Sequence, residues 1–214
     1  MTTTLEEAYR RHHSSHEREG FAILEEERGA LFCRLIGTGK KVLDIGCRDG
    51  TLTRHFIAGN DVTGADIDAH ALERAAGMLG IRTMQFDLNG PNWPFEPASF
   101  DVVVAAEVLE HLFNPEQVLE HISRILKPGG MLVGSVPNAF SLKCRLRYLV
   151  GSKRGTPLAD PMHINQFSWQ EMKGLLDDEF VRVSLMPLGR KTGGLRDIAP
   201  SLFAFGIAFR AFTQ

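Results

Sequence analysis

The chain has 214 residues, a length that fits one α/β domain better than two. Hydrophobic residues make up 43% and charged residues 23%, which is ordinary for a protein with a buried core, and the net charge of -2 provides no basic field to attract nucleic acid. The polar N-terminus is unlike a secretory signal, no apolar run is long enough to span a bilayer, and Cys33, Cys47 and Cys144 fit neither a disulfide framework nor a zinc site, so we expect a cytoplasmic protein.

The N-terminal part of the chain is predicted to be helical. Between residues 5 and 36, apolar side chains recur at helical spacing among Glu and Arg, and no proline interrupts them. The stretch 10–18 is rich in His and Ser and is expected to form a mobile or lid-like arm. We therefore predict a helical arm or lid over 1–36 and one domain over 37–214.

Within the predicted domain, short apolar strands alternate with helices. The predicted strands are 41–45, 61–65, 82–86, 100–105, 131–136, 180–188 and 202–212. The predicted helices are 51–58, 69–79 with Asp68 as its N-cap, 115–127, and 169–178 with Ser168 as its N-cap. No helix is expected between the last two strands. In the last of them, Phe203, Phe205, Phe209 and Phe212 are interpreted mainly as sheet core. This order predicts a parallel sheet covered on both faces.

The most informative segment is 42–50, where a strand runs into a glycine turn that opens a helix. Gly46 and Gly50 allow the backbone to turn sharply and to approach a bound nucleotide closely. Asp44 ends the strand, and its carboxylate would repel a phosphate but suits an amino-bearing ligand. A nicotinamide-dependent oxidoreductase is disfavoured for that reason, and because the G-x-G-x-x-G order is absent.

Acidic residues also end the next two predicted strands. Asp66 follows the glycine turn by about 20 residues, the position from which a carboxylate accepts hydrogen bonds from ribose hydroxyls. Asp87 is placed to accept a hydrogen bond from an exocyclic amine. The three acids together describe a site for a ribose, an amine and an adenine, whereas Asp68 and Asp101 are interpreted as cap and strand-edge residues.

These motifs resemble the class I S-adenosylmethionine-dependent methyltransferases, of the type 11/23-like kind found with small-molecule, glycan or lipid pathways. Asp44-x-Gly46-x-x-x-Gly50 is similar to their first motif, 64–68 to their ribose-binding segment and 126–130 to the turn before their fifth strand. The resemblance covers nearly the whole chain. It implies a Rossmann-like, seven-stranded, mostly parallel sheet with an antiparallel last strand, and S-adenosylmethionine as cofactor with S-adenosylhomocysteine as product. The cofactor-binding residues that it implies are Asp44, Gly46, Cys47, Gly50, Asp66, Ile67, Asp87, Leu88 and Ala106.

The methyl acceptor is expected to lie after the fourth strand and against an irregular, basic insertion at about 138–166. The resemblance implies transfer to oxygen, less favourably nitrogen, of a small molecule, glycan or lipid head group. His163, His111 and Glu107 are the candidates for handling the acceptor proton. Glu107, Glu110 and His111 would share one helical face and could hold a divalent metal, as a similar arrangement does in ubiquinone-pathway O-methyltransferases, but we do not favour a metal.

Two features keep alternatives open. Arg48 stands where the resembling family often has Gly, so a non-catalytic cofactor-binding partner or regulatory subunit is the alternative to an enzyme. A basic cluster in the insertion could receive an anionic acceptor or be solvated surface; its members are Lys143, Arg145, Arg147, Lys153 and Arg154. Few aromatic residues accompany this cluster, which disfavours nucleic acid as a partner. No oligomeric state is predicted.

Overall fold

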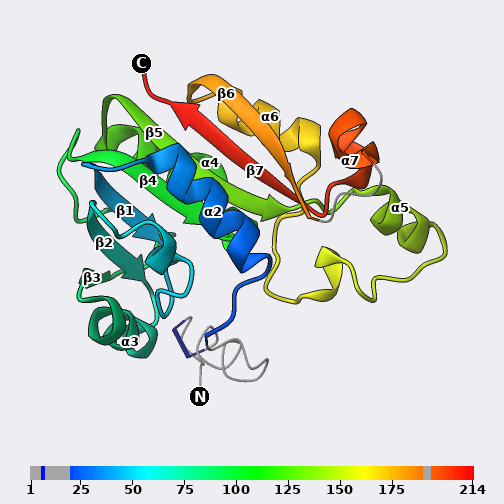
Figure 1. Ribbon diagram of the computed structural model, residues 1–214. Helices are drawn as coiled ribbons and strands as arrows, with labels where there is room; N and C mark the ends of the chain where they lie inside the picture. Colours follow the sequence, from blue (N-terminus) through cyan, green and yellow to red (C-terminus); the bar gives the residue numbers. More distant parts are fainter. Residues whose placement is uncertain (1–5, 8–19, 190–193) are drawn as a thin grey trace.

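A computed structural model describes residues 6–7, 20–189 and 194–214. Its centre is a seven-stranded sheet in the order β3-β2-β1-β4-β5-β7-β6 (Figure 1). The strands are β1 Lys41–Ile45, β2 Asp61–Asp66, β3 Arg82–Gln85, β4 Phe100–Ala106, β5 Leu126–Pro137, β6 Val181–Leu188 and β7 Gly206–Phe212. Strands β1 to β5 pair in parallel, and β7 runs antiparallel to both β5 and β6. The predicted fold, including its antiparallel last strand, is therefore confirmed.

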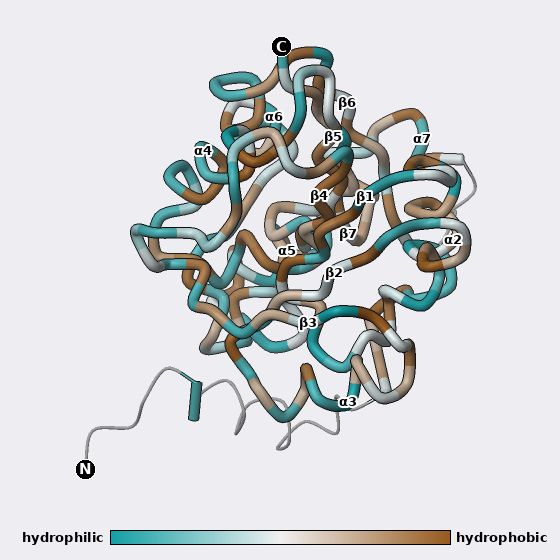
Figure 2. Tube along the Cα trace, turned by 90° about the vertical axis from the view of Figure 1, so that its left-hand side faces the viewer, coloured by the Kyte–Doolittle hydropathy of each residue, from teal (hydrophilic) through white to brown (hydrophobic). Residues whose placement is uncertain are grey.

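Helices cover both faces of this sheet. Helix α2 (Glu25–Ile36) lies across one face, α4 (Pro115–Ile125) and α6 (Trp169–Asp177) cover the other, and α3 (Ala69–Leu79) lies beside β2 and β3 (Figure 1). Figure 2 shows the hydrophobic strands β1, β4 and β7 together at the centre. Successive β4 residues point to opposite faces: Val102 and Val104 join the core under α2, and Val103 joins the core under α4 and α6. Burial on both faces explains the continuous apolar run of β4.

The N-terminal helix is shorter than predicted. Helix α2 begins at Glu25, and the preceding Leu24 has φ 52°, a left-handed conformation that ends any helical run from the N-terminal side. Residues 20–24 form turns instead, and the predicted arm 10–18 lies outside the described residues.

Three other helix predictions were wrong. The segment 51–58 holds only a 3₁₀ turn, Thr53–His55, with Thr53 bonded inward to Asp44. The insertion contains α5 (Leu142–Leu149), and α7 (Leu195–Ile198) and α8 (Pro200–Phe203) separate the last two strands. Of the four phenylalanines assigned to the sheet core, Phe209 is fully buried and Phe212 is partly buried against the core under α2, whereas Phe205 is exposed and Phe203 lies on α8. Among the described residues, no helix combines the length and apolar character needed to cross a membrane.

Candidate active site

A cleft of about 690 Å³ opens at the carboxyl ends of β1, β2 and β4, where the sheet order reverses between β1 and β4. Its volume lies within the range of small-molecule sites, and a reversal of strand order is the usual place for a ligand in such sheets. Most of the residues predicted from the sequence line it: Asp44, Gly46, Cys47, Asp66, Ile67, Asp87, Leu88, Ala106, Glu107, Glu110, His111 and His163.

Both glycines of the turn are needed, but for different contacts. Gly46 has φ 69°, and a Cβ there would lie 2.5 Å from Val108 Cγ2, so the backbone can approach the cleft only without a side chain. Gly50 has φ 81° and does not line the cleft; a Cβ there would lie 2.5 Å from Leu79 Cδ1. The absence of a side chain at Gly50 thus lets α3 pack against the turn.

Asp44 is a buried carboxyl at the end of β1. The Thr53 hydroxyl donates to its Oδ2 at 2.7 Å. Burial raises the pKa of Asp44 to about 7; the Thr53 hydrogen bond lowers the pKa and the nearby charge of Asp66 adds to the rise. A cationic group in the cleft would favour the ionised form, so Asp44 is suited to an ammonium ligand.

Asp66 is fixed at the end of β2 by two backbone groups. Its Oδ2 accepts from Arg48 N–H and its Oδ1 from Asp68 N–H, both at 2.9 Å. Asp68 in turn caps α3 by accepting from His70 N–H, as predicted. A carboxylate has room for further hydrogen bonds beside these two, so Asp66 can also receive hydroxyl groups from a ligand.

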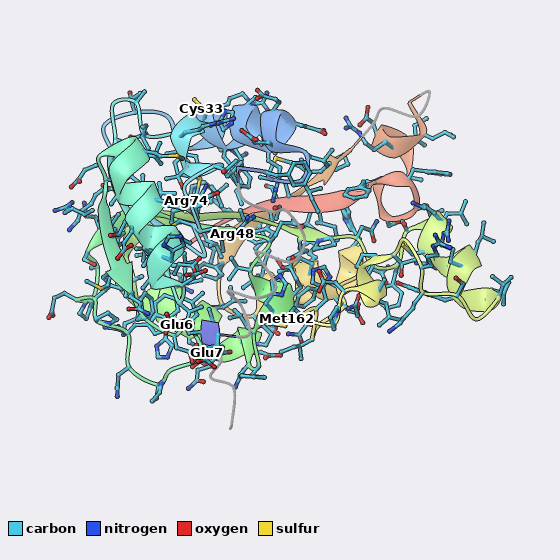
Figure 3. The ribbon with its side chains drawn as sticks, turned by 90° about the horizontal axis from the view of Figure 1, so that it is seen from below. Glu6, Glu7, Cys33, Arg48, Arg74 and Met162 are labelled. Atoms are coloured by element: carbon cyan, nitrogen blue, oxygen red, sulfur yellow. The ribbon has the colours of Figure 1, made fainter. Side chains whose placement is uncertain are left out.

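Arg48 occupies a position that favours glycine, since its φ is 51°. Its Nη1 donates to the carbonyl oxygen of Phe21 at 3.2 Å, which ties the turn to the segment before α2. In Figure 3, which views the molecule from below, Arg48 lies between Arg74 of α3 and Met162 of the insertion. Arg48 lines the cleft together with Asp44 and Asp66, so the cradle remains open in its presence.

At the far rim of the cleft, Asp87 and Asn89 form a local turn. Asp87 is exposed, and its Oδ1 accepts from Asn89 N–H at 2.9 Å and from the Asn89 side-chain amide at 3.0 Å. Asn89 Oδ1 accepts from Phe113 N–H at 2.8 Å. These bonds hold Asp87 beside Ile67 and Leu88, at the rim that an adenine would occupy under the sequence prediction.

Asp49 is a cleft residue that the sequence analysis missed. Its Oδ2 accepts from Gly20 N–H at 2.7 Å, and its Oδ1 accepts from the Thr51 hydroxyl at 2.7 Å. Burial alone would raise the pKa of Asp49, but these hydrogen bonds hold it below its ordinary value. In the sequence, Asp49 is distinguished only as a second acid, after Asp44, in the segment 42–50. That pattern does not predict its contact with Gly20.

Glu107 is not on a helix, contrary to the prediction that placed it on one face with Glu110 and His111. Its φ is 55°, and the 3₁₀ turn that follows spans Leu109–His111. The Ser135 hydroxyl donates to Glu107 Oε1 at 2.9 Å, and Arg28 Nη1 lies 3.5 Å from the same oxygen. Arg28 comes from α2 and Ser135 from β5, so two distant parts of the chain hold this carboxylate.

His163, from the insertion, takes the place beside Glu110 and His111 that the sequence analysis gave to Glu107. Ligand atoms of Glu110, His111 and His163 lie within 4.8 Å of one another, and the two imidazole centroids are 4.8 Å apart. The return of the insertion is fixed by Asn165, whose side-chain amide donates to Leu112 O at 2.6 Å and whose N–H donates to Glu110 O at 2.9 Å. The local sequence around His163 does not predict that this residue lies close to Glu110 and His111.

The three side chains of this cluster differ in their surroundings. Glu110 is 1% exposed, and neither carboxyl oxygen has a hydrogen-bond partner among the described residues. Burial, and then the charge of Glu107, raise the pKa of Glu110 well above its ordinary value. His111 Nδ1 donates to Met162 O at 2.9 Å, which directs the lone pair to Nε2. His163 Nε2 lies 3.7 Å from Asp160 Oδ2.

The sequence is similar to those of known proteins. A family model described as a methyltransferase domain matches residues 16–179. A ubiquinone biosynthesis O-methyltransferase of Paraburkholderia phymatum is 35% identical over 134 residues, covering 54% of this chain and 52% of that protein. The protein of the same name from Dechloromonas aromatica is 28% identical over 176 residues, with 72% of each chain covered. The chain thus spans about half the length of the first of these relatives.

Solved structures share the fold at low identity. A SAM-dependent methyltransferase of Thermotoga maritima superposes with a TM-score of 0.71 at 16% identity, covering 94% of this chain and 96% of that one. One from Archaeoglobus fulgidus gives a TM-score of 0.68 at 17% identity, covering 94% and 99%. At such identities the likeness shows the fold alone.

Proposed function

The chain belongs to the methyltransferase domain family, and from that premise we propose that it transfers the methyl group of S-adenosylmethionine to an oxygen of a small molecule, glycan or lipid head group. The observation that carries this proposal is the placement of Asp44, Asp66 and Asp87 at the ends of adjacent strands around one cleft that also holds His111 and His163. Transfer to oxygen is supported by the O-methyltransferase relatives, and transfer to nitrogen is the less favoured outcome.

Each cofactor residue has a role that follows from its surroundings. The buried Asp44 carboxyl receives the ammonium group of the methionine part, and Asp66 receives the ribose hydroxyls. Ile67, Leu88 and Asp87 border the adenine. Gly46, Cys47 and Ala106 line the cleft with small side chains or none, and Gly50 sets the shape of the turn. The pKa of the Cys47 thiol is raised by burial and then by the charges of Asp44 and Asp66, so this residue packs rather than reacts.

S-adenosylmethionine supplies an electrophilic methyl group attached to a sulfonium. The acceptor oxygen forms the new C–O bond, the C–S bond breaks, and the acceptor proton passes to a histidine nitrogen. His163 is the proposed base because the nearby Asp160 carboxylate would stabilise its protonated form, and His111 is the second candidate. Glu107 is held by Ser135 and Arg28, and in this proposal it positions the segment that follows β4.

Calorimetric titration with S-adenosylmethionine and S-adenosylhomocysteine tests the cofactor part of the proposal. Asp66→Asn should weaken binding by roughly tenfold or more, because one hydrogen-bonding charge is lost. Asp61→Asn is the matched control, since Asp61 begins the same strand, is exposed and pairs with Arg82 outside the cleft. Equal affinities for the two variants would refute the role given to Asp66.

The alternative, a non-catalytic cofactor-binding subunit, is distinguished by turnover. Methyl transfer to any phenol, sugar or lipid acceptor in a radiolabel screen supports the enzyme. Tight binding of both nucleosides without transfer to any acceptor favours the subunit. The cytoplasmic setting also remains a proposal, supported by cysteines that form no disulfide in the described part of the chain.

A further inference from the structure

Helix α5 presents an apolar stripe to solvent. Leu142, Leu146, Leu149 and Val150 recur at helical spacing on one side, with exposed fractions of 38%, 56%, 82% and 77%. Cys144, on the opposite side of the helix, is buried. The amphipathic pattern is thus the reverse of that of a surface helix, whose apolar side faces the core. Exposed apolar patches of this kind mark interaction surfaces.

Further exposed apolar residues lie on α7, at the same end of the molecule as α5. Helix α8 packs against both α5 and α7, and Figure 1 shows α5 and α7 at the same end of the molecule, far from β3. Ile198 of α7 is 81% exposed, and Leu195 of α7 is 47% exposed. We use the name α5 surface for the α5 stripe together with Leu195 and Ile198.

Positive charge surrounds the α5 stripe. The segment 138–159 contains five basic residues and no Asp or Glu, although the whole chain has a net charge of -2. On the helix, Lys143 and Arg145 flank the stripe, and Lys153 and Arg154 are exposed in the segment that follows Val150. Arg and Lys with long aliphatic stems beside exposed leucines are typical of interfacial helices on anionic membranes.

We propose that the α5 surface docks on an anionic lipid bilayer, with Leu149 and Val150 entering the headgroup region and the basic side chains contacting lipid phosphates. The same segment forms one wall of the cleft through Ser141, Lys143 and Thr156. Docking would therefore place the cleft beside the lipid surface. If the chain is a methyltransferase as proposed, this docking implies an acceptor that is a lipid or is dissolved in the membrane. The docking itself does not depend on methyl transfer.

A second copy of the chain fits this surface less well. A two-fold interface would bring the basic segment 138–159 of one molecule against the same segment of the other, and no acid within that segment could neutralise it. An acidic protein could neutralise the charge, but it would not require the two most exposed side chains of the α5 stripe, Leu149 and Val150, to lie together at the end of the helix.

Vesicle flotation of the full chain tests the proposal. Vesicles of equal parts phosphatidylglycerol and phosphatidylcholine should carry the protein upward, and pure phosphatidylcholine vesicles should not. The double variant K153Q/R154Q should bind roughly 25-fold more weakly, from about fivefold for each basic residue at the surface. L149S/V150S should lower binding at least tenfold. Met78→Ser is the matched control, because Met78 is 58% exposed on α3, away from the α5 surface.

Thermal unfolding of the four proteins controls for folding, and S-adenosylhomocysteine titration reports the cofactor site separately. None of the substituted residues lines the cleft. Failure to float with phosphatidylglycerol vesicles overturns the docking proposal even if S-adenosylhomocysteine binds, and flotation without nucleoside binding would sink the proposed function alone. Equal loss of flotation in Met78→Ser, or a dimer in sedimentation that L149S/V150S dissociates, would also overturn it.

Discussion

The pH dependence of cofactor binding provides a sharp test of the site, because it depends on one buried group. Burial raises the pKa of Asp44 to about 7. An ammonium group bound beside it would return its pKa toward the ordinary range of a carboxyl. Binding then requires the ionised form, so the protein must release a proton when the ligand binds below pH 7.

The sign and size of the effect follow by linkage. As the pH falls through 7, Asp44 in the free protein becomes protonated and affinity decreases; well above 7 the affinity no longer changes with this group. Between pH 8 and pH 6, the Kd for S-adenosylhomocysteine should rise about tenfold, and at pH 7 about half a proton should be released on binding. Calorimetry in buffers of different ionisation enthalpy measures both quantities.

Asp44→Asn is the control that distinguishes the contribution of Asp44 to this pH dependence from that of the histidines in the cleft. It should bind more weakly than the unmodified protein at pH 8 and show a nearly flat profile between pH 6 and 8. If the unmodified protein has a constant Kd over this range, or if the Asn variant retains the same slope, the role given to Asp44 is refuted.

The other predictions concern the turn and the acceptor side. Arg48→Gly relieves the left-handed conformation and should raise the free energy of unfolding by about 0.5–1 kcal/mol without changing the Kd for S-adenosylhomocysteine, whereas weakened binding would mean that Arg48 contacts the ligand. Glu110→Gln should retain turnover, since burial raises the pKa of Glu110 and favours the neutral carboxyl group that Gln resembles, and EDTA should have no effect; EDTA inhibition that this variant abolishes would instead assign Glu110, His111 and His163 as metal ligands. His163→Ala should lower turnover at least about 100-fold with unchanged affinity for S-adenosylhomocysteine, and retained turnover would exclude His163 as the base.

Much of the cofactor side could be predicted because its determinants are local. A strand that ends in Asp44, a turn with Gly46 and Gly50, and the cap residue Asp68 each express a conformational preference within a few residues. The apolar runs of β1 and β4 have no polar alternation, which itself predicts burial on both faces. The helix predictions failed where tertiary contacts overrode local pattern, as at Thr53, whose hydroxyl bonds to Asp44.

The sequence by itself therefore determined the sheet, its helical layers and the acids at the strand ends, because these depend on periodicity and on short-range turn chemistry. Only the tertiary structure decided which groups meet at the acceptor side. His163 reaches Glu110 and His111 through the fold of the insertion, and Arg28 reaches Glu107 from α2. Contacts between residues this far apart in the chain are selected by packing and by the pairing of buried polar groups, and no local pattern encodes them.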